Sequence, residues 1–286
     1  MEISLCIQKV LPILLRDNTT NRNVIWATST GAETEMQVSD VTTIQPRVMK
    51  SQLEQKNRTK GKAEVFTPSW LCNDMNNHCD EVWFGRTDVF NKPGEKEHSW
   101  ISTDVVVFPN EPGKTWMDYV LSMRLEITCG EAPYLVSRYD TTTGKIIPVS
   151  ERIGILDRKL RVVNENADTY NDWLLWTFNA YRSTYGYEYQ GDNLLIARIN
   201  MLETFVDNMV ARWNVEPCAH ELMLIAHIIS WNIWQMDGLT NQVPMSDEYC
   251  IIRDWSSGNE IVFNTLMEVD DNGKTRTKKK SKNAGK

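Results

Sequence analysis

Two segments in the second half of the chain show the three- and four-residue spacing of apolar positions that is typical of an amphipathic helix. The first starts near residue 192 and contains Leu195, Ile199, Leu202, Val206 and Met209. The second starts at Pro217 and contains Leu222, Ile225, Ile229 and Ile233. Its end has an alternative interpretation, because Trp and Ile favour strands and residues 232–237 would then form one.

Shorter apolar patterns predict the remaining elements. Further helices are expected at residues 3–15, 47–57, 70–82 and 173–182, with Ser69 as the N-cap of the third and a short additional helix beginning at Tyr134. Strands are expected at residues 23–28, 105–108, 124–128, 183–188 and 249–253, with an extended segment at 61–68. Residues 91–115 are rich in Pro, Gly, Asn and Glu and are expected to form a long loop around the strand at 105–108.

This alternation of strands and helical patterns favours an α/β fold with a mostly parallel sheet and right-handed crossovers. We expect a helical N-terminal extension over residues 1–60 and an α/β domain over residues 61–267. Residues 268–286 are expected to form a basic, solvated tail, because seven Lys or Arg and no acidic residues lie between Lys274 and Lys286.

Charge argues against a broad DNA-gripping surface. The 286 residues include 31 basic and 38 acidic side chains; without the seven basic residues of the tail, residues 1–273 hold 24 basic and 38 acidic ones, a net charge of −14. An electropositive face of the kind that binds DNA unaided is therefore not expected.

The six cysteines form no C-x-x-C pair, and His220 and His227 lack a H-E-x-x-H pattern, so neither a metal site nor a disulfide framework is expected. No apolar run reaches the length of a membrane span, and polar Gln8 and Lys9 break the N-terminal one, so we expect no signal peptide. A reducing cytoplasm fits these features.

Four short segments carry residue types suited to a nucleotide-like cofactor. In residues 125–135 (LEITCGEAPYL) an acid ends a strand that runs into a glycine turn, where a backbone can approach a ligand closely. Glu188 ends the Tyr-Gly-Tyr-Glu strand, and a carboxylate there can accept hydrogen bonds from two ribose hydroxyls. Asp237 follows the third candidate strand, and Phe66-Thr67-Pro68 precedes a helix. Each segment taken alone also fits an ordinary turn, cap or strand end.

In this order the segments resemble the adenine-specific, amino-methylating DNA methyltransferases of restriction–modification systems, in particular short chains labelled as methylase subunits. Residues 125–135 are similar to that family's D-P-A-C-G-S-G-x-F-L element, residues 185–188 to its Y-G-V-E element, and Leu194–Arg198 to the helix that follows it. The resemblance covers roughly residues 56–240 and implies a class I methyltransferase-like (Rossmann-like) fold that binds S-adenosylmethionine.

The resemblance also implies roles for individual residues. Phe66, Thr67 and Pro68 would lie near the methionine part of the cofactor, and Glu126, Cys129 and Gly130 would surround its methionine and sulfonium side. Glu188 would hold the ribose and Asp237 the adenine amine.

Two departures from the family pattern bear on activity. Ala132 stands where the family has its second glycine, and the chain contains no Pro-Pro dipeptide, so the family's Asn-Pro-Pro-Tyr catalytic element has no counterpart. Asp254 and Trp255 offer an acid and an aromatic ring at the expected place, and they are the catalytic candidates. The implied function is a DNA adenine methyltransferase that acts with a partner subunit. The alternatives are a pseudo-methyltransferase that serves as a scaffold or anti-defence protein, and a methyltransferase fold turned to another small-molecule reaction.

Overall fold

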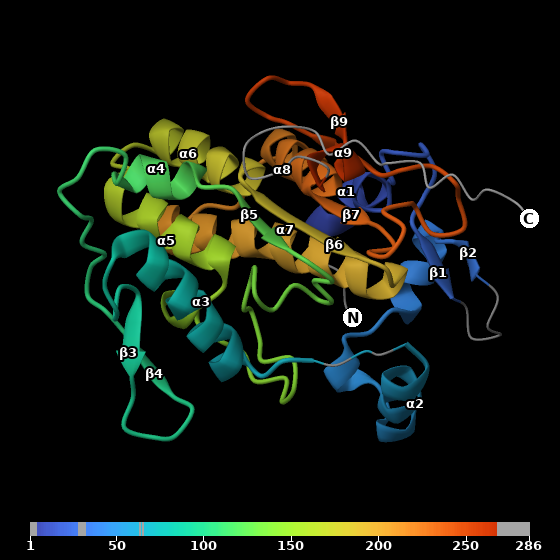
Figure 1. Cartoon of the computed structure of the whole chain (residues 1–286), viewed down its shortest axis with the longest axis horizontal. Helices are drawn as coiled ribbons and strands as arrows, with labels where there is room; N and C mark the ends of the chain where they lie inside the picture. Colours follow the sequence, from blue (N-terminus) through green and yellow to red (C-terminus); the bar gives the residue numbers. More distant parts are fainter. Residues whose placement is uncertain (1–4, 28–32, 63, 65, 268–286) are drawn as a thin grey trace, which may run out of the picture.

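The computed structural model describes residues 5–27, 33–62, 64 and 66–267, which form a mixed α/β fold (Figure 1). The described helices are α1 Leu5–Leu14, α2 Gln52–Lys62, α3 Ser69–Phe84, α4 Trp116–Leu121, α5 Ile155–Asn166, α6 Tyr170–Arg182, α7 Gly191–Trp213, α8 Ala219–Asn232 and α9 Phe263–Met267, with short 3₁₀ turns η1 Val38–Thr43, η2 Arg47–Met49 and η3 Val149–Glu151. The described strands are β1 Ile25–Ala27, β2 Glu33–Glu35, β3 Asn91–Pro93, β4 Trp100–Ser102, β5 Arg124–Glu126, β6 Thr184–Glu188, β7 Ile233–Gln235, β8 Ile251–Arg253 and β9 Glu260–Val262.

A three-stranded parallel sheet lies at the centre of the fold, in the spatial order β5-β6-β7. Its register pairs Leu125 with Tyr185 and Gly186 with Ile233. Helices α5 and α6 connect β5 to β6, and α7 and α8 connect β6 to β7, as parallel neighbours require long crossovers. The other described strands form antiparallel pairs: β1 with β2, β3 with β4 and β8 with β9. The expected parallel sheet is thus confirmed for three strands only.

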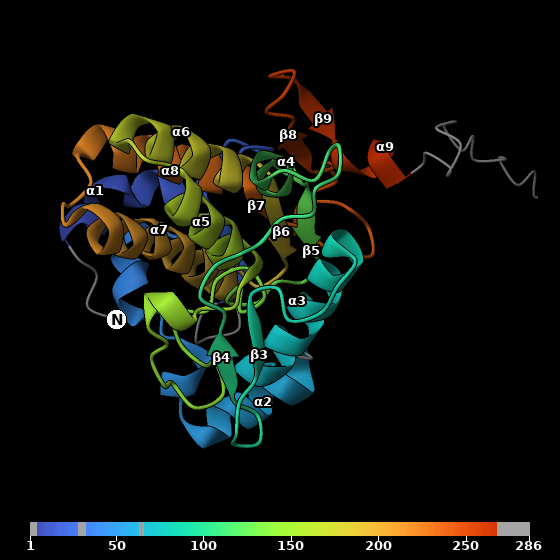
Figure 2. The same cartoon turned by 90° about the vertical axis from the view of Figure 1, so that its left-hand side faces the viewer.

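The two faces of this sheet have different partners. On one face Gly186 and Ile233 pack against helices, and an added Cβ at Gly186 would lie 3.3 Å from the Ile233 and Leu135 side chains. On the other face Tyr187 and Trp234 pack with the β8–β9 hairpin and α9. Figure 2 shows helices α1 and α5–α8 on one side of the three strands and the β8–β9 hairpin with α9 on the other. The sheet is therefore covered by two different kinds of structure.

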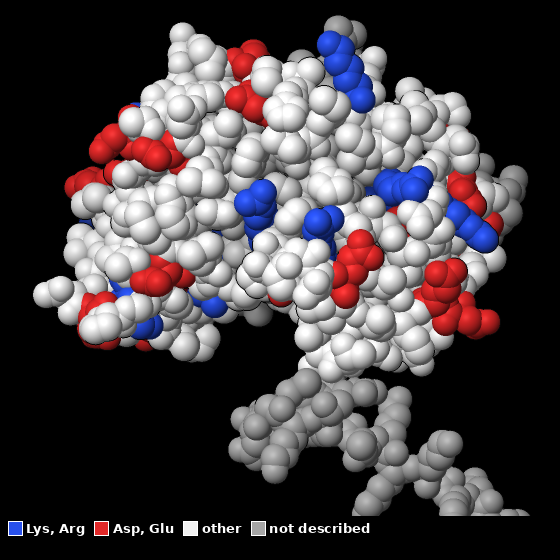
Figure 3. Space-filling view, turned by 90° about the horizontal axis from the view of Figure 1, so that it is seen from above, with Lys and Arg blue, Asp and Glu red and all other residues white. Residues whose placement is uncertain are grey.

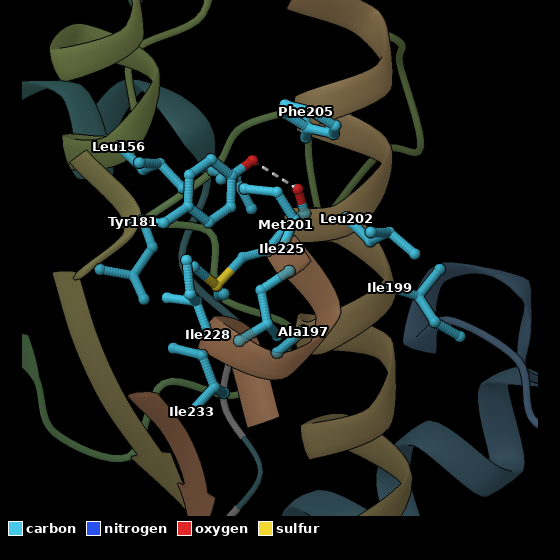
Figure 4. Packing of buried hydrophobic residues seen from close by; sticks show 14 of the residues in the cluster. Leu156, Tyr181, Ala197, Ile199, Met201, Leu202, Phe205, Ile225, Ile228 and Ile233 are labelled. Carbon is cyan, nitrogen blue, oxygen red and sulfur yellow. Dashed lines mark hydrogen bonds between the residues drawn. The ribbon is translucent and has the colours of Figure 1, made fainter. Parts of the chain in front are cut away.

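Helix α7 forms the centre of the helical core. Residues 191–202 are all buried, so this helix is surrounded on every side over its first three turns. Figure 4 shows part of this packing, in which the Tyr181 hydroxyl donates a hydrogen bond of 2.8 Å to the Met201 carbonyl. A helix that is buried on every side belongs inside a fold. The amphipathic pattern predicted burial of one face only, and it did not indicate that polar residues such as Asp192, Arg198 and Asn200 are buried as well.

Arg198 of α7 joins four parts of the chain. Its guanidinium is fully buried and donates to the carbonyl oxygens of Leu14, Arg16, Ser230 and Ile233, at 2.6, 2.9, 3.2 and 2.7 Å. Burial lowers the pKa of Arg198 to about 10, a value at which it stays charged near neutral pH. This single side chain therefore connects the ends of α1 and α8 and the start of β7 to α7.

The structure confirms most of the expected elements. Helices are present, with shifted ends, in the two amphipathic segments and in the described parts of 3–15, 70–82 and 173–182. Strands are present, also with shifted ends, in the described parts of 23–28, 124–128, 183–188 and 249–253. Residues 232–237 include a strand, β7, so the alternative interpretation of that segment holds. The proposed basic tail, 268–286, lies outside the described residues.

Four element predictions are wrong. Residues 105–108 form no strand, since the hairpin β3–β4 occupies the expected loop instead. No helix begins at Tyr134, where the chain turns to bring residues 134 and 135 against the start of α5. The N-cap of α3 is Pro68, because the Ser69 amide donates to an Asp140 oxygen. The helix expected at 47–57 is a 3₁₀ turn followed by α2, which begins only at residue 52.

Replacing Arg198 with methionine should lower the free energy of unfolding by about 3 kcal/mol or more, because four buried carbonyl groups lose a charged donor. Urea unfolding followed by circular dichroism measures this loss. Arg22→Met is the matched control, since the Arg22 side chain is 70% exposed, and its effect should stay within about 0.5 kcal/mol. Equal stability of the two variants would contradict the central role of Arg198.

Candidate functional site

The carboxyl ends of the three parallel strands bring acidic residues to one edge of the sheet. Glu126 is the last residue of β5, Glu188 is the last residue of β6, and Asp237 follows β7 by two positions. In open α/β sheets, ligands bind outside this edge. The structure therefore places three of the residues predicted from sequence on the edge where a cofactor site is expected.

The turn after β5 has an unusual backbone. Thr128, Gly130 and Ala132 have φ values of 50°, 56° and 65°, so the chain enters the left-handed region at every second residue. The amides of residues 129 and 132 donate to backbone carbonyls. Here the Gly130 N–H donates to Glu188 Oε2 at 2.9 Å. A Cβ added at Gly130 would meet no atom within 4 Å, so space lies open beside it.

Ala132 has a strained backbone in this turn. It is fully buried and adopts the left-handed conformation that glycine favours. A non-glycine residue in this conformation carries a strain of about 1–2 kcal/mol. The turn thus keeps the backbone path of a glycine-rich loop although its residue type differs.

Two carboxylates approach each other beside this turn. Glu188 is 7% exposed, and besides the Gly130 N–H it accepts the Gln190 N–H at 2.9 Å through Oε1. Burial raises the pKa of Glu188. Glu126 is half-buried, and its Oε2 is shielded from solvent with no hydrogen-bond partner among the described residues. Burial and the nearby Glu188 charge raise the pKa of Glu126 well above its usual value.

The segment before α3 covers the same edge with charged side chains. Asp192, in the first turn of α7, accepts from Lys50 Nζ at 3.0 Å and forms an ion pair with Arg58 at 2.8 Å. Arg58 also pairs with the buried Glu64. Glu131 of the turn accepts the Arg47 N–H at 2.6 Å. These contacts fix the N-terminal segment over the carboxyl edge.

Phe66, Thr67 and Pro68 are close to this group of residues. Phe66 is buried beneath the Arg47 guanidinium, whose Cζ lies 5.0 Å from the ring centroid, and Pro68 caps α3. The Thr67 carbonyl accepts from the Thr141 hydroxyl at 3.1 Å.

The first turn of α3 adds a buried thiol to this region. Burial raises the pKa of the Cys72 thiol to about 12, with a further contribution from the Glu126 carboxylate, and the Cys72 Sγ lies 3.7 Å from the Thr67 carbonyl. Burial, then Glu126, likewise raises the pKa of the Cys129 thiol, so neither thiol is an activated nucleophile. Cys72 thus links the Phe66–Pro68 segment to the end of β5.

Asp237 lies beside a cavity of about 300 Å³. Tyr189, which directly follows Glu188, forms part of the wall, and residues 240–247 close the far side. One Asp237 oxygen, Oδ1, accepts the Leu239 N–H at 2.8 Å. The cavity offers an aromatic ring and a carboxylate between the ends of β6 and β7, a combination suited to a planar ligand with a hydrogen-bond donor.

Asp254 and Trp255 lie elsewhere. The Trp255 indole N–H donates to Asn232 Oδ1 at 2.7 Å, and Asn232 in turn donates to the carbonyl of Thr184, the first residue of β6. This is the amino edge of the sheet. Asp254 sits in the β8–β9 turn, where its carboxylate accepts from the hydroxyls of Ser256 and Ser257. The structure does not bring these two residues to the carboxyl edge, because β8 belongs to a separate hairpin.

Several site residues were missed in the sequence. Tyr189 could have been found, since it follows the acid at the end of a predicted strand. Arg58 gave no such signal, because its partner Asp192 is 134 residues away and no local pattern connects them. Glu64 belongs to the group through its own ion pair with Arg58, six residues before it.

Comparison of the chain with protein-family models, with curated proteins and with solved structures found no match. Among the described residues, no group of three or more His, Cys, Asp or Glu side chains is arranged to hold a metal ion. None of the helices in the described ranges is both long and apolar enough to cross a membrane.

Glu126→Gln should stabilise the protein increasingly as the pH rises. The pKa of Glu126 is raised in the folded state, so the folded protein binds the Glu126 proton more tightly than the unfolded chain does. The wild type therefore loses stability as the pH rises above about 4.5. The amide removes that loss, and the gain at pH 8 should be on the order of 1 kcal/mol, with little difference at pH 4. Urea unfolding at a series of pH values measures it, and a pH-independent difference would contradict the assignment.

Proposed function

We propose that this chain binds S-adenosylmethionine at the carboxyl edge of its parallel sheet, as a methyltransferase-like subunit of a DNA adenine-modifying system. One observation carries the proposal: acidic residues follow three successive parallel strands in the order that the sequence resemblance implies. In this proposal the three strands and their crossover helices form the cofactor half of a class I methyltransferase-like, Rossmann-like fold.

The residues present fit such a cofactor in several respects. The open space beside Gly130 admits a ligand close to the backbone, and Glu126 Oε2, which has no partner in the described ranges, offers an acceptor beside the turn. The cofactor would supply an electrophilic methyl group. Tyr189 and Asp237 are suited to the adenine ring and its amine, and Glu188 to the ribose hydroxyls, since each carboxylate oxygen can accept a second hydrogen bond.

Base recognition is assigned to a partner. The chain has no Asn-Pro-Pro-Tyr element, and Asp254 and Trp255 lie at the amino edge of the sheet, away from the proposed cofactor. The acidic body also lacks the charge that gripping DNA alone requires. A partner subunit that supplies the base-binding element and the DNA contacts would complete the enzyme.

Calorimetric titration with S-adenosylmethionine and S-adenosylhomocysteine tests the cofactor proposal. We expect saturable binding of both, and Asp237→Ala should weaken it about tenfold or more, because the adenine amine loses its acceptor. Glu216→Gln is the control, since it removes one exposed negative charge beyond the far end of α7 and should leave the affinity unchanged. Absence of heat with either ligand at millimolar concentration would refute the cofactor, and an unaffected Asp237 variant would refute its position.

A second candidate function is that of a scaffold without transfer activity. It is favoured by the placement of Asp254 and Trp255, which leaves the carboxyl edge without a base-binding tetrapeptide. Transfer of labelled methyl groups to unmethylated DNA, measured with and without candidate partner subunits, separates the two functions. Transfer that requires the partner supports the methyltransferase subunit, whereas cofactor binding without transfer under any condition supports the scaffold.

A further inference from the structure

We propose that Arg182 and Arg253, gathered around Trp255 at the amino edge of the sheet, form a binding site for a phosphate group. This site is separate from the proposed cofactor site, which lies at the carboxyl edge of the same strands. It does not depend on that function, and it gives the Trp255 region a role other than catalysis.

The two guanidinium groups share one aromatic ring. The Arg253 Cζ lies 5.0 Å from the Trp255 ring centroid, and the Arg182 Cζ lies 5.5 Å from it. Arg253 is also 5.8 Å from the centroid of Trp231. Because both guanidinium groups lie against the Trp255 ring, cation–π attraction holds each of them beside the same indole.

The ring itself is held firmly. Asn232 is fully buried; it accepts the Trp255 indole N–H through Oδ1 and donates through Nδ2 to the carbonyls of Tyr181, Arg182 and Thr184. The Tyr185 hydroxyl donates to the Arg253 carbonyl at 2.9 Å. The hairpin that carries Arg253 is thus attached to the sheet next to the end of α6 that carries Arg182, and the site is preorganised.

The positive charge of this pair is not neutralised within the described part of the chain. Neither guanidinium forms an ion pair there, although Glu260 stands opposite Arg253 in the β8–β9 register. Asp254 is occupied by serine hydroxyls in its own turn. The Nε atoms of Arg182 and Arg253 are both buried and have no hydrogen-bond partner among the residues that the structure describes. Burial, then the neighbouring Arg253 charge, lowers the pKa of Arg182 and of the adjacent His227.

These features select the ligand. Two guanidinium groups carry a charge of +2, which a phosphate dianion balances and a carboxylate of charge −1 does not, and a phosphate offers three or four oxygens to the two planar groups. An anion placed there would relieve the repulsion between the two cations. Figure 3, which looks onto the face formed by α6, α8 and β9, shows wide uncharged areas and no continuous basic band. The site is therefore suited to a single phosphate, free or at the end of a nucleotide, rather than to a length of duplex.

Calorimetric titrations of the full chain at low ionic strength test this inference with three probes: inorganic phosphate, a nucleoside 5′-monophosphate, and a short 5′-phosphorylated single strand. We expect saturable binding, with Arg253→Gln and Arg182→Gln each raising the Kd about tenfold or more. Equal affinity for all three probes would identify the isolated phosphate as the ligand, and tighter binding of the nucleotide or strand would identify a nucleic-acid end.

Controls separate the site from general charge and from the fold. Arg22→Gln removes the same charge from an exposed position and should change the Kd less than twofold. The melting temperature of each variant is measured in phosphate-free buffer, and at least one of the two site variants must remain folded while losing affinity. No saturation by any probe at millimolar concentration, or an equal loss in Arg22→Gln, would overturn the proposal. Asp237→Ala should retain phosphate binding, so failure of the cofactor proposal is distinguishable.

Discussion

The fold depends on a buried guanidinium that has only carbonyl oxygens as acceptors. Arg198 reaches the ends of α1 and α8 and the first residue of β7, three places where backbone acceptors would otherwise lack donors. A buried charge is expensive unless its hydrogen bonds are satisfied, and here all the acceptors are backbone groups. Because several segments share one donor, their relative positions are linked.

The three-stranded parallel sheet has two chemically different edges. At the carboxyl edge, Glu126 and Glu188 lie beside the turn that follows β5, where the Gly130 N–H donates to Glu188, and the N-terminal segment is held there by ion pairs to Asp192. At the amino edge, Arg182 and Arg253 stand around Trp255 without an acidic partner in the described ranges. Parallel strands produce this separation naturally, because every strand begins at one edge and ends at the other.

The sequence was informative where a residue's neighbours are local. The spacing of apolar residues located α7, and the acid at the end of the Tyr-Gly-Tyr-Glu run located Glu188 at a strand end. It failed where partners are distant. Trp255 seemed to follow a strand of the main sheet, yet β8 pairs with β9 alone, and no local pattern distinguishes the two pairings. Arg58 was missed for the same reason, since it acts on Asp192 across 134 residues.

The contact between Gln235 and the peptide of Ile25 also constrains how the chain reaches its fold. The side-chain amide of Gln235 both donates to and accepts from Ile25, at 2.7 Å each, and so joins β1, which also pairs with β2, to the end of β7 across 210 residues of sequence. Helix α1 packs against α8, whose residues are synthesised just before Gln235. During synthesis the apolar side of α1 therefore waits for most of the chain to emerge, and its exposure over that interval is a period in which aggregation competes with folding.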